Sequence, residues 1–261
     1  MKLSANSLFH FTSKKKYLLN ILKGSFSPRY CLETFNHIYD GEILELAIPM
    51  TCFCDIPLSA MNEHFTKYGE YGIGLTKEWG IRNGLSPILY VNNDSFSQKC
   101  IQKTFETSLQ HDLVITDLKE TFPEFTKDIP NIYEHMYALN LLFLTKPYIG
   151  DMPRGEKILK KIEFYNEREW RYLPMEYLLR TNESTVFGKD ILQSKGEKVN
   201  EIVSEFKLEF TANDIKYIIV SEEKEIADLI SEINSIEKFN KTDKTFLISR
   251  LISVEQIKSD F

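Results

Sequence analysis

Two glutamates spaced two apart, Glu167 and Glu169, form a pattern that could support electrostatic or acid–base catalysis. Residues 164–172 alternate as a β-strand does, so both carboxylates and Arg171 are expected to point to one face. Burying such a cluster of charges costs free energy unless the charges are paired, so the cluster is expected to be exposed, paired or used in chemistry. The alternative is a solvated edge strand with a simple Glu–Arg ion pair, since the same spacing recurs inside a predicted surface helix at Glu223.

A second candidate group lies where an apolar strand leads into a helix near the start of the chain. His10 belongs to the predicted strand of residues 7–12, Ser13 stands at the N-cap position, and Gly24 closes the helix. Three lysines from Lys14 to Lys16 oppose the helix macrodipole, each at a cost of about a few tenths of a kcal/mol. A bound anion would relieve that conflict. The alternative is an exposed lysine run without a ligand, beside a histidine that is part of the core.

A third group combines cysteine, histidine and tyrosine. Cys52 and Cys54 lie in an apolar run, and His64, Tyr68 and Tyr71 follow it. The Cys-x-Cys spacing lacks the knuckle of structural zinc sites, so we expect no metal centre and treat both thiols as buried apolar groups. Cys54 as a nucleophile would need a base, and His64 is the nearest in sequence, but nothing in the sequence specifies that geometry. Phosphate-binding glycine loops and serine nucleophile elbows are also absent from the sequence.

Composition and charge narrow the classes of protein that could hold these groups. The chain has 261 residues, 43% of them hydrophobic, and its 32 basic and 38 acidic residues give a net charge of −6. A net-negative protein contacts nucleic acid only through a local patch. No apolar stretch reaches the roughly 18 residues of a membrane span, and no signal peptide is evident. We therefore expect a soluble cytoplasmic protein with reduced cysteines.

The predicted elements mix strands and helices along the chain. Strands are expected at residues 7–12, 48–56, 72–75, 87–91, 164–172 and 215–220, with a last one around 245–248. Helices are expected after Ser13 and at residues 97–113, 131–144 and 222–233, with a turn or short helix from residue 64. With no repeat or linker, residues 1–261 read as a single α+β domain, a central split or mixed sheet flanked by helices. Residues 179–196 are polar and are expected to form a mobile excursion.

Several of these segments resemble the bacterial abortive-phage-resistance family AbiGi. The resemblance covers residues 7 to 175 and is most specific at Cys52-Phe53-Cys54-Asp55-Ile56-Pro57. Its other parts are residues 8–12, 28–31, 48–58, 68–79 and 168–171. That family is generally described as the antitoxin half of a two-protein phage-exclusion system. The resemblance therefore implies a partner protein rather than a reaction.

A more distant resemblance concerns mechanism. A histidine on the first strand, a capped helix, a tyrosine and a late strand glutamate are similar to the His-Tyr-Glu layout of ADP-ribosyltransferases, including DarT-like enzymes. The resemblance implies that His10 binds the ribose of NAD, that Tyr30 or Tyr71 stacks on nicotinamide, and that Glu169 is catalytic. Glu167 would then orient the acceptor. It also implies an ADP-ribosyltransferase-like fold.

The remaining NAD contacts follow from that resemblance and from the charge near the first helix. Thr12, Ser13, Lys14 and Arg29 join His10 and the tyrosines as expected NAD-binding residues, since a pyrophosphate needs a cationic site. We thus expect an NAD-dependent ADP-ribosyltransferase-like effector in phage defence, modifying a nucleic acid or a protein. The alternatives are a non-catalytic antitoxin that restrains a toxin, and a degenerate fold that senses a phage product. No membrane contact is expected.

Overall fold

The computed structural model describes most of the chain. The described residues are 5–35, 37–38, 45–121, 134–154, 157–174, 187–188, 192–194 and 198–260. No helix in these ranges is both long enough and apolar enough to cross a membrane. Most of the predicted excursion at residues 179–196 lies outside the described residues.

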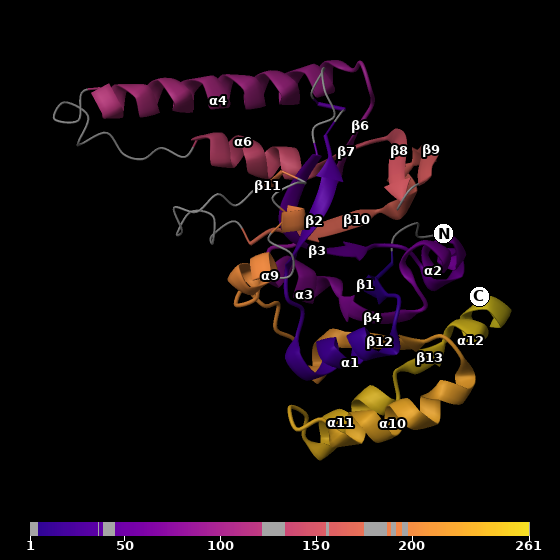
Figure 1. The fold of residues 1–261 in the computed structure, drawn as a ribbon. Helices are drawn as coiled ribbons and strands as arrows, with labels where there is room; N and C mark the ends of the chain where they lie inside the picture. Colours follow the sequence, from indigo (N-terminus) through magenta and orange to yellow (C-terminus); the bar gives the residue numbers. More distant parts are fainter. Residues whose placement is uncertain are drawn as a thin grey trace.

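A nine-stranded mixed sheet organises the molecule (Figure 1). Its main path runs β13-β12-β4-β1-β3-β10-β5, with β2 and β11 also pairing β3. Only β12 and β13 pair in parallel among these strands. The sheet strands are β1 (Ser7–Thr12), β2 (Arg29–Thr34), β3 (Glu45–Cys54), β4 (Tyr71–Thr76), β5 (Ser86–Pro87), β10 (Glu169–Tyr172), β11 (Phe187–Gly188), β12 (Ile215–Val220) and β13 (Leu251–Ser253).

Two small sheets and a set of helices complete the fold. One small sheet pairs β6 (Leu89–Val91) with β7 (Thr145–Pro147), and the other pairs β8 (Ile149–Arg154) with β9 (Lys157–Glu163). The α-helices are α1 (Lys15–Gly24), α2 (Asn62–Tyr68), α3 (Lys77–Arg82), α4 (Phe96–Thr121), α6 (Glu134–Phe143), α9 (Lys198–Val203), α10 (Ile226–Ser235), α11 (Lys241–Ile248) and α12 (Val254–Asp260). The 3₁₀ turns are η1 (Leu58–Ala60), η2 (Phe164–Glu167), η3 (Ala212–Asp214) and η4 (Glu223–Glu225). The expected combination of a mixed sheet with flanking helices is confirmed.

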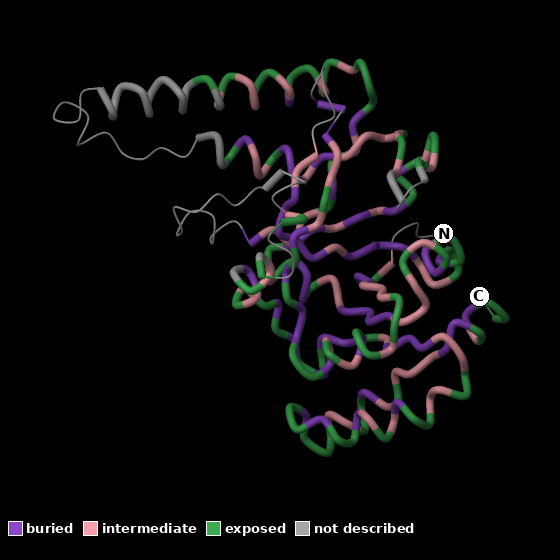
Figure 2. The backbone as a smooth tube through the Cα atoms, in the orientation of Figure 1, coloured by how far each residue is buried: buried purple, intermediate pink, exposed green. Residues whose placement is uncertain are grey.

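Alternation along β1 assigns its side chains to two different cores. Leu8 pairs Leu75 and His10 pairs Ile73 across β4, so these residues share one face of the sheet. On that face the core gathers buried residues of α1, α3 and α10, including Trp79. Phe9 lies on the other face, in a core that α2 and α12 cover. Figure 2 shows the buried residues running along the strands between these layers.

The helices α4 and α6 form a separate pair. They run side by side and extend away from the sheet (Figure 1). Near the sheet, their buried residues Ile101, Leu142 and Phe143 pack against β3 and β6. This third core holds the α4–α6 pair against β3.

Three local predictions need correction. The predicted strand around residues 245–248 is wrong, because residues 241–248 form α11, which the side chain of Asn240 caps by accepting from the Asp243 N–H at 2.9 Å. The predicted N-cap at Ser13 is wrong, because α1 starts one residue later, with Lys14 as its N-cap. The strand expected at residues 87–91 is divided between β5 and β6, which belong to different sheets.

Candidate active site

A cavity of about 300 Å³ opens beside the junction of β1, β3 and β10. Among the described residues, β1 and β3 pair at Phe9 and Cys54 alone, and the two strands then separate. The lining residues combine aromatic rings, thiols and charged groups: Phe9, His10, Phe11, Cys31, Glu33, Met50, Cys52, Phe53, Cys54, His64, Tyr68, Lys146, Met152, Glu167 and Glu169. Three predicted catalytic residues, His10, Glu167 and Glu169, are thus brought to one pocket.

Glu169 is fixed by its place on β10. It pairs Cys54 across β3, and Arg171 pairs Cys52, so the two charged side chains share a face as predicted. The Arg171 Nε donates to Glu169 Oε1 at 2.7 Å, and its Nη2 donates to Oε2 at 3.3 Å. The arginine is buried, with 1% of its surface exposed. The alternative of an edge-strand pair in solvent is therefore wrong.

Glu167 reaches the pocket by a different route from the predicted one. It ends the 3₁₀ turn η2, and Arg168 then takes a left-handed conformation with φ 42° before β10 begins. The predicted strand alternation over residues 164–168 is therefore wrong, although Glu167 is buried. Its Oε1 accepts from the Tyr68 hydroxyl at 2.7 Å.

Lys146 of β7 links the two glutamates. Its Nζ donates to Glu167 Oε2 at 3.0 Å and to Glu169 Oε2 at 2.9 Å. Burial alone would lower the pKa of Lys146, but the carboxylates of Glu169, Glu33 and Glu167 outweigh it and raise the pKa well above its ordinary value. The ammonium group therefore stays charged and acts as an ionic clamp.

Glu33 of β2 completes the network. Its Oε2 accepts from Arg171 Nη2 at 2.9 Å, and Arg171 Nη1 donates to the Phe143 carbonyl at 2.7 Å. Burial alone would raise the pKa of Glu169, but Arg171 and Lys146 hold it well below its ordinary value. Three carboxylates face two cations, so this part of the cavity carries a formal charge of −1.

His10 lines the same pocket from the opposite face of the sheet. Its ring contacts Phe26 and Phe53, with centroids 5.3 and 5.5 Å away. Burial lowers the pKa of His10, so the imidazole is neutral at pH 7 and Nδ1–H donates to the Cys52 carbonyl at 2.8 Å. The hydrogen bond spans the gap where β1 leaves β3. The imidazole and the Glu169 carboxylate therefore approach the cavity from opposite faces.

The structure places neither expected tyrosine in this cavity. The backbone N–H of Tyr30 on β2 donates to Asn200 Oδ1 at 2.9 Å, and its side chain is buried. The hydroxyl of Tyr71 donates to Glu225 Oε1 at 3.1 Å, beside η4. Tyr68 lines the pocket instead. The sequence grouped Tyr68 with His64, and their spacing of four residues puts both on one side of α2.

The expected phosphate site also lies apart from the cavity. Thr12, Ser13, Lys14 and Arg29 are not among its lining residues. The Thr12 hydroxyl donates to the Lys14 carbonyl at 3.2 Å, and Lys15 pairs with Asp228 of α10. That ion pair offsets part of the cationic charge at the start of α1, as a bound anion was expected to do.

The cysteine-rich segment supplies the central strand of the site. Cys52 and Cys54 lie on β3, and Cys31 lies on β2. Burial raises the pKa of Cys31 to about 11 and raises those of Cys52 and Cys54 as well, so these thiols stay protonated and weakly nucleophilic. Cys54 is buried, as expected, whereas Cys52 is only half-buried and lines the cavity.

Two residues of the network escaped the sequence analysis. Glu33 lies two residues after Cys31, and strand alternation could have linked it to the pocket. Lys146 carries no comparable signal, because it comes from a three-residue strand far from Glu169 in sequence. Its role depends on tertiary packing alone.

Comparison with known proteins agrees with the AbiGi resemblance. Residues 24–221 match the family model described as "Putative abortive phage resistance protein AbiGi, antitoxin". The chain is also similar to the abortive phage resistance protein AbiGi of Lactococcus lactis subsp. cremoris, at 28% identity over 263 residues, covering 91% of this chain and 100% of the relative. No solved structure matches. With the family model spanning most of its length, this chain belongs to the AbiGi family of abortive phage resistance proteins.

Proposed function

We propose that this chain acts in phage exclusion as a binding component that restrains a partner toxin without catalysing ADP-ribosyl transfer. The observation that carries the proposal is the ionic clamp on Glu169, whose carboxylate is bound by Arg171 at 2.7 Å and by Lys146 at 2.9 Å. A carboxylate that stabilises an oxocarbenium-like transition state needs uncompensated negative charge aimed at the sugar. Here Arg171 and Lys146 already bind both of its oxygens.

The position of His10 supports the same proposal. In the transferase mechanism an imidazole and a carboxylate grip one ribose, but these two groups approach the cavity from opposite faces of the sheet. The His10 ring packs against both Phe26 and Phe53, which also contact each other. The residues matched by the antitoxin family model, 24–221, include the ionic network and leave out His10.

The proposal is tested by separating turnover from restraint. The purified chain is incubated with NAD and released nicotinamide is measured; in parallel, it is co-expressed with the protein encoded by the neighbouring gene, and growth is followed. We expect no nicotinamide release, and relief of any growth arrest that the neighbour causes. His10→Asn is the matched variant, because its amide can still donate to the Cys52 carbonyl, and it should restrain the neighbour as well as the wild type does.

The opposite pattern would overturn the restraining role. If the chain alone arrests growth and releases nicotinamide, and His10→Asn abolishes both while melting at the same temperature, the chain is a toxin with transferase activity. A neighbour whose toxicity is unchanged by this chain would equally contradict the proposal.

A second candidate, NAD-dependent ADP-ribosyl transfer to a nucleic acid or protein, is favoured by one observation. His10, Glu167 and Glu169 line one cavity of about 300 Å³, together with the rings of Phe9 and Phe11. That volume suits a flat ring such as nicotinamide. A carboxylate has about four acceptor positions, and the contacts from Arg171 and Lys146 to Glu169 use three, so one remains for a ribose hydroxyl.

This candidate requires that NAD is the substrate and that the sheet is split as in ADP-ribosyltransferases. It makes a direct prediction, because a ligand that binds the native state raises the melting temperature by mass action. Millimolar NAD should then stabilise the wild type, with a smaller effect on Tyr68→Leu, which removes a ring from the cavity wall. Both candidates place the chain in the cytoplasm.

A further inference from the structure

Helix α2 brings a buried imidazole to the cavity of about 300 Å³. His64 lines this cavity, and only 6% of its surface is exposed. Its ring contacts Tyr68 and Phe11, with centroids 5.0 and 6.5 Å away. In the described part of the chain no group hydrogen-bonds to either ring nitrogen, and neither nitrogen is sealed from solvent. The polar atoms of His64 are therefore open to a ligand in the cavity.

The His64 imidazole is neutral at physiological pH. Burial lowers its pKa to about 4, with a further contribution from the charge of Lys67. A neutral imidazole has one nitrogen that donates a hydrogen bond and one that accepts. A buried polar group without a partner costs free energy, so a ligand with polar atoms at this position would be favoured over an apolar one.

Glu167 offers two further acceptor positions in the same cavity. Its Oε1 accepts from the Tyr68 hydroxyl at 2.7 Å, and its Oε2 accepts from Lys146 Nζ at 3.0 Å. A carboxylate oxygen has about two acceptor positions, so one remains at each oxygen of Glu167 among the contacts of the described residues. Two N–H donors that lie side by side in one plane would occupy both positions, as in other bidentate carboxylate contacts.

Aromatic side chains surround these acceptors. Phe9 and Phe11 of β1 lie on the face of the sheet that α2 covers, and their rings are stacked with centroids 6.1 Å apart. Tyr68 also lines the cavity and is 39% exposed, which places its ring at the rim. The volume is at the lower end of the range for ligand sites. Walls and volume together favour one small, flat ring system.

We propose that this cavity binds a guanine base, whose N1–H and N2–H donate side by side to the Glu167 carboxylate while His64 hydrogen-bonds to another polar atom of the base. Guanine carries two adjacent donors on its Watson–Crick edge, whereas adenine and cytosine place a donor beside an acceptor there. Its flat ring also suits the aromatic walls. This inference goes beyond the restraining role and does not depend on it.

Calorimetric titration of guanosine into the full chain at pH 7 tests the proposal without any substitution. Inosine is the matched ligand, because it keeps N1–H and lacks only the N2 amine. We expect inosine and adenosine to bind at least about tenfold more weakly than guanosine, since each leaves an acceptor of Glu167 unpaired. Nicotinamide, whose carboxamide places an N–H beside a carbonyl, should also bind more weakly.

A pair of variants on α2 tests the contribution of His64. His64→Phe keeps a ring and removes both nitrogens, and we expect it to weaken guanosine at least about fivefold. Glu63→Gln is the control, because the Glu63 side chain is 84% exposed and lies outside the cavity lining. It should bind guanosine as the wild type does.

The source of the base is separated by titrating a short single-stranded RNA of adenines with one guanine. Equal or weaker binding than guanosine assigns the site to a free nucleoside, and tighter binding assigns it to an unpaired base in a strand; both support recognition of guanine. The proposal is overturned if guanosine fails to bind at millimolar concentration, if inosine or nicotinamide binds as tightly, or if His64→Phe binds guanosine as the wild type does. The growth and nicotinamide-release assays have separate readouts, so failure of the restraining role is distinguishable from failure here.

Discussion

At the residue scale, Glu169 shows how much a functional interpretation depends on the partners of a side chain. The same carboxylate that resembles a catalytic glutamate in the sequence is the centre of a buried network with Lys146 and Arg171. Removing one member of such a network leaves its partners under-compensated in a medium of low polarity, which is why buried ion pairs are costly to break. The network therefore makes Glu169 a residue on which folding depends.

We accordingly expect Glu169→Gln to destabilise the protein. The substitution keeps the size of the side chain but removes the charge that balances the two cations, at a cost of about 3 kcal/mol. For a chain of this length that lowers Tm by roughly 10 °C in a thermal melt. Glu232→Gln is the control, because its partner Lys23 is partly exposed and such pairs contribute about 1 kcal/mol or less. Equal Tm values for the two variants would show that the ion pairs of Glu169 do not stabilise the fold.

At the element scale, the connection between β1 and α1 depends on Gly69, whose backbone packs closely against Thr12 and Ser13. This glycine follows α2 with φ 112°, and a Cβ there would lie 2.2 Å from the Thr12 carbonyl oxygen. No side chain fits without moving the end of β1, the strand that carries His10.

Gly69→Ala should therefore destabilise the fold by about 2 kcal/mol or more, measured as a lower urea midpoint at an unchanged m-value. Gly24→Ala is the matched control, since a Cβ at Gly24 meets nothing within 4 Å and alanine favours helix. We expect the control to be neutral or slightly stabilising. A Gly69→Ala midpoint equal to that of the control would contradict the close approach.

The elements also show what the sequence could and could not predict. The apolar runs of β1, β4 and β12 were recognisable because burial fixes their composition. The run at residues 245–248 has the same composition, but Asn240 and Asp243 form a capping box that starts a helix there. Short apolar runs do not distinguish strand from helix, and in this case the cap decided between them.

The site was predictable only in part for a related reason. Strand alternation correctly placed Glu169 and Arg171 on one face, because that relation is local. The face of the sheet to which His10 points is set by the pairing of β1 with β4. Lys146 reaches Glu169 because β7 lies beside the site. Both relations depend on how strands distant in sequence pack together. The spacing of residues in the sequence does not predict such contacts.

At the scale of the whole molecule, buried histidines make stability depend on pH. Burial lowers the pKa of His10, and it lowers those of His37 and His64 to about 4. Histidines of the unfolded chain have pKa values of about 6.5, so between pH 6.5 and 4 the unfolded chain binds more protons than the native state at His37 and His64. Stability is highest above pH 6.5 and falls as the pH drops toward 4.

Urea unfolding at a series of pH values measures this effect. His37 and His64 each contribute a slope of up to about 1.4 kcal/mol per pH unit between pH 6.5 and 4. His64→Phe should flatten the slope by one such contribution, because it removes one proton acceptor while keeping a ring against Phe11. A free energy of unfolding that stays constant from pH 7 to pH 5 would show that these rings are accessible to protons in the native state.

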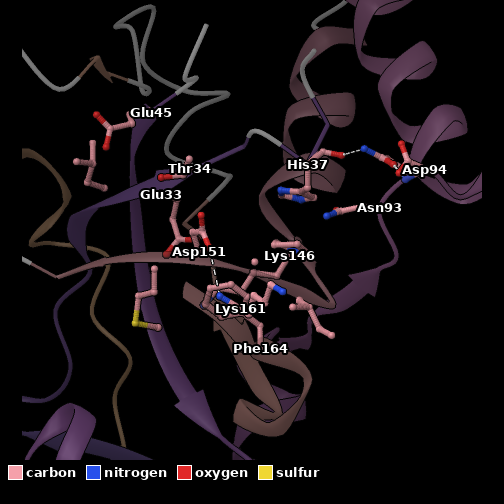
Figure 3. Close-up of a pocket in the computed structure, with 16 residues that line it drawn as sticks. Glu33, Thr34, His37, Glu45, Asn93, Asp94, Lys146, Asp151, Lys161 and Phe164 are labelled. Atoms are coloured by element: carbon pink, nitrogen blue, oxygen red, sulfur yellow. Dashed lines mark hydrogen bonds between the residues drawn. The ribbon is translucent and has the colours of Figure 1, made fainter. Parts of the chain in front are cut away.

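Glu33 and Lys146 line both the cavity of about 300 Å³ beside β1, β3 and β10 and a larger cavity of about 880 Å³ (Figure 3). The carboxylate of Glu33 also accepts from the Arg171 guanidinium at 2.9 Å, which ties this residue to the ionic network around Glu169. A substitution at Glu33 or Lys146 therefore alters the lining of both cavities at once.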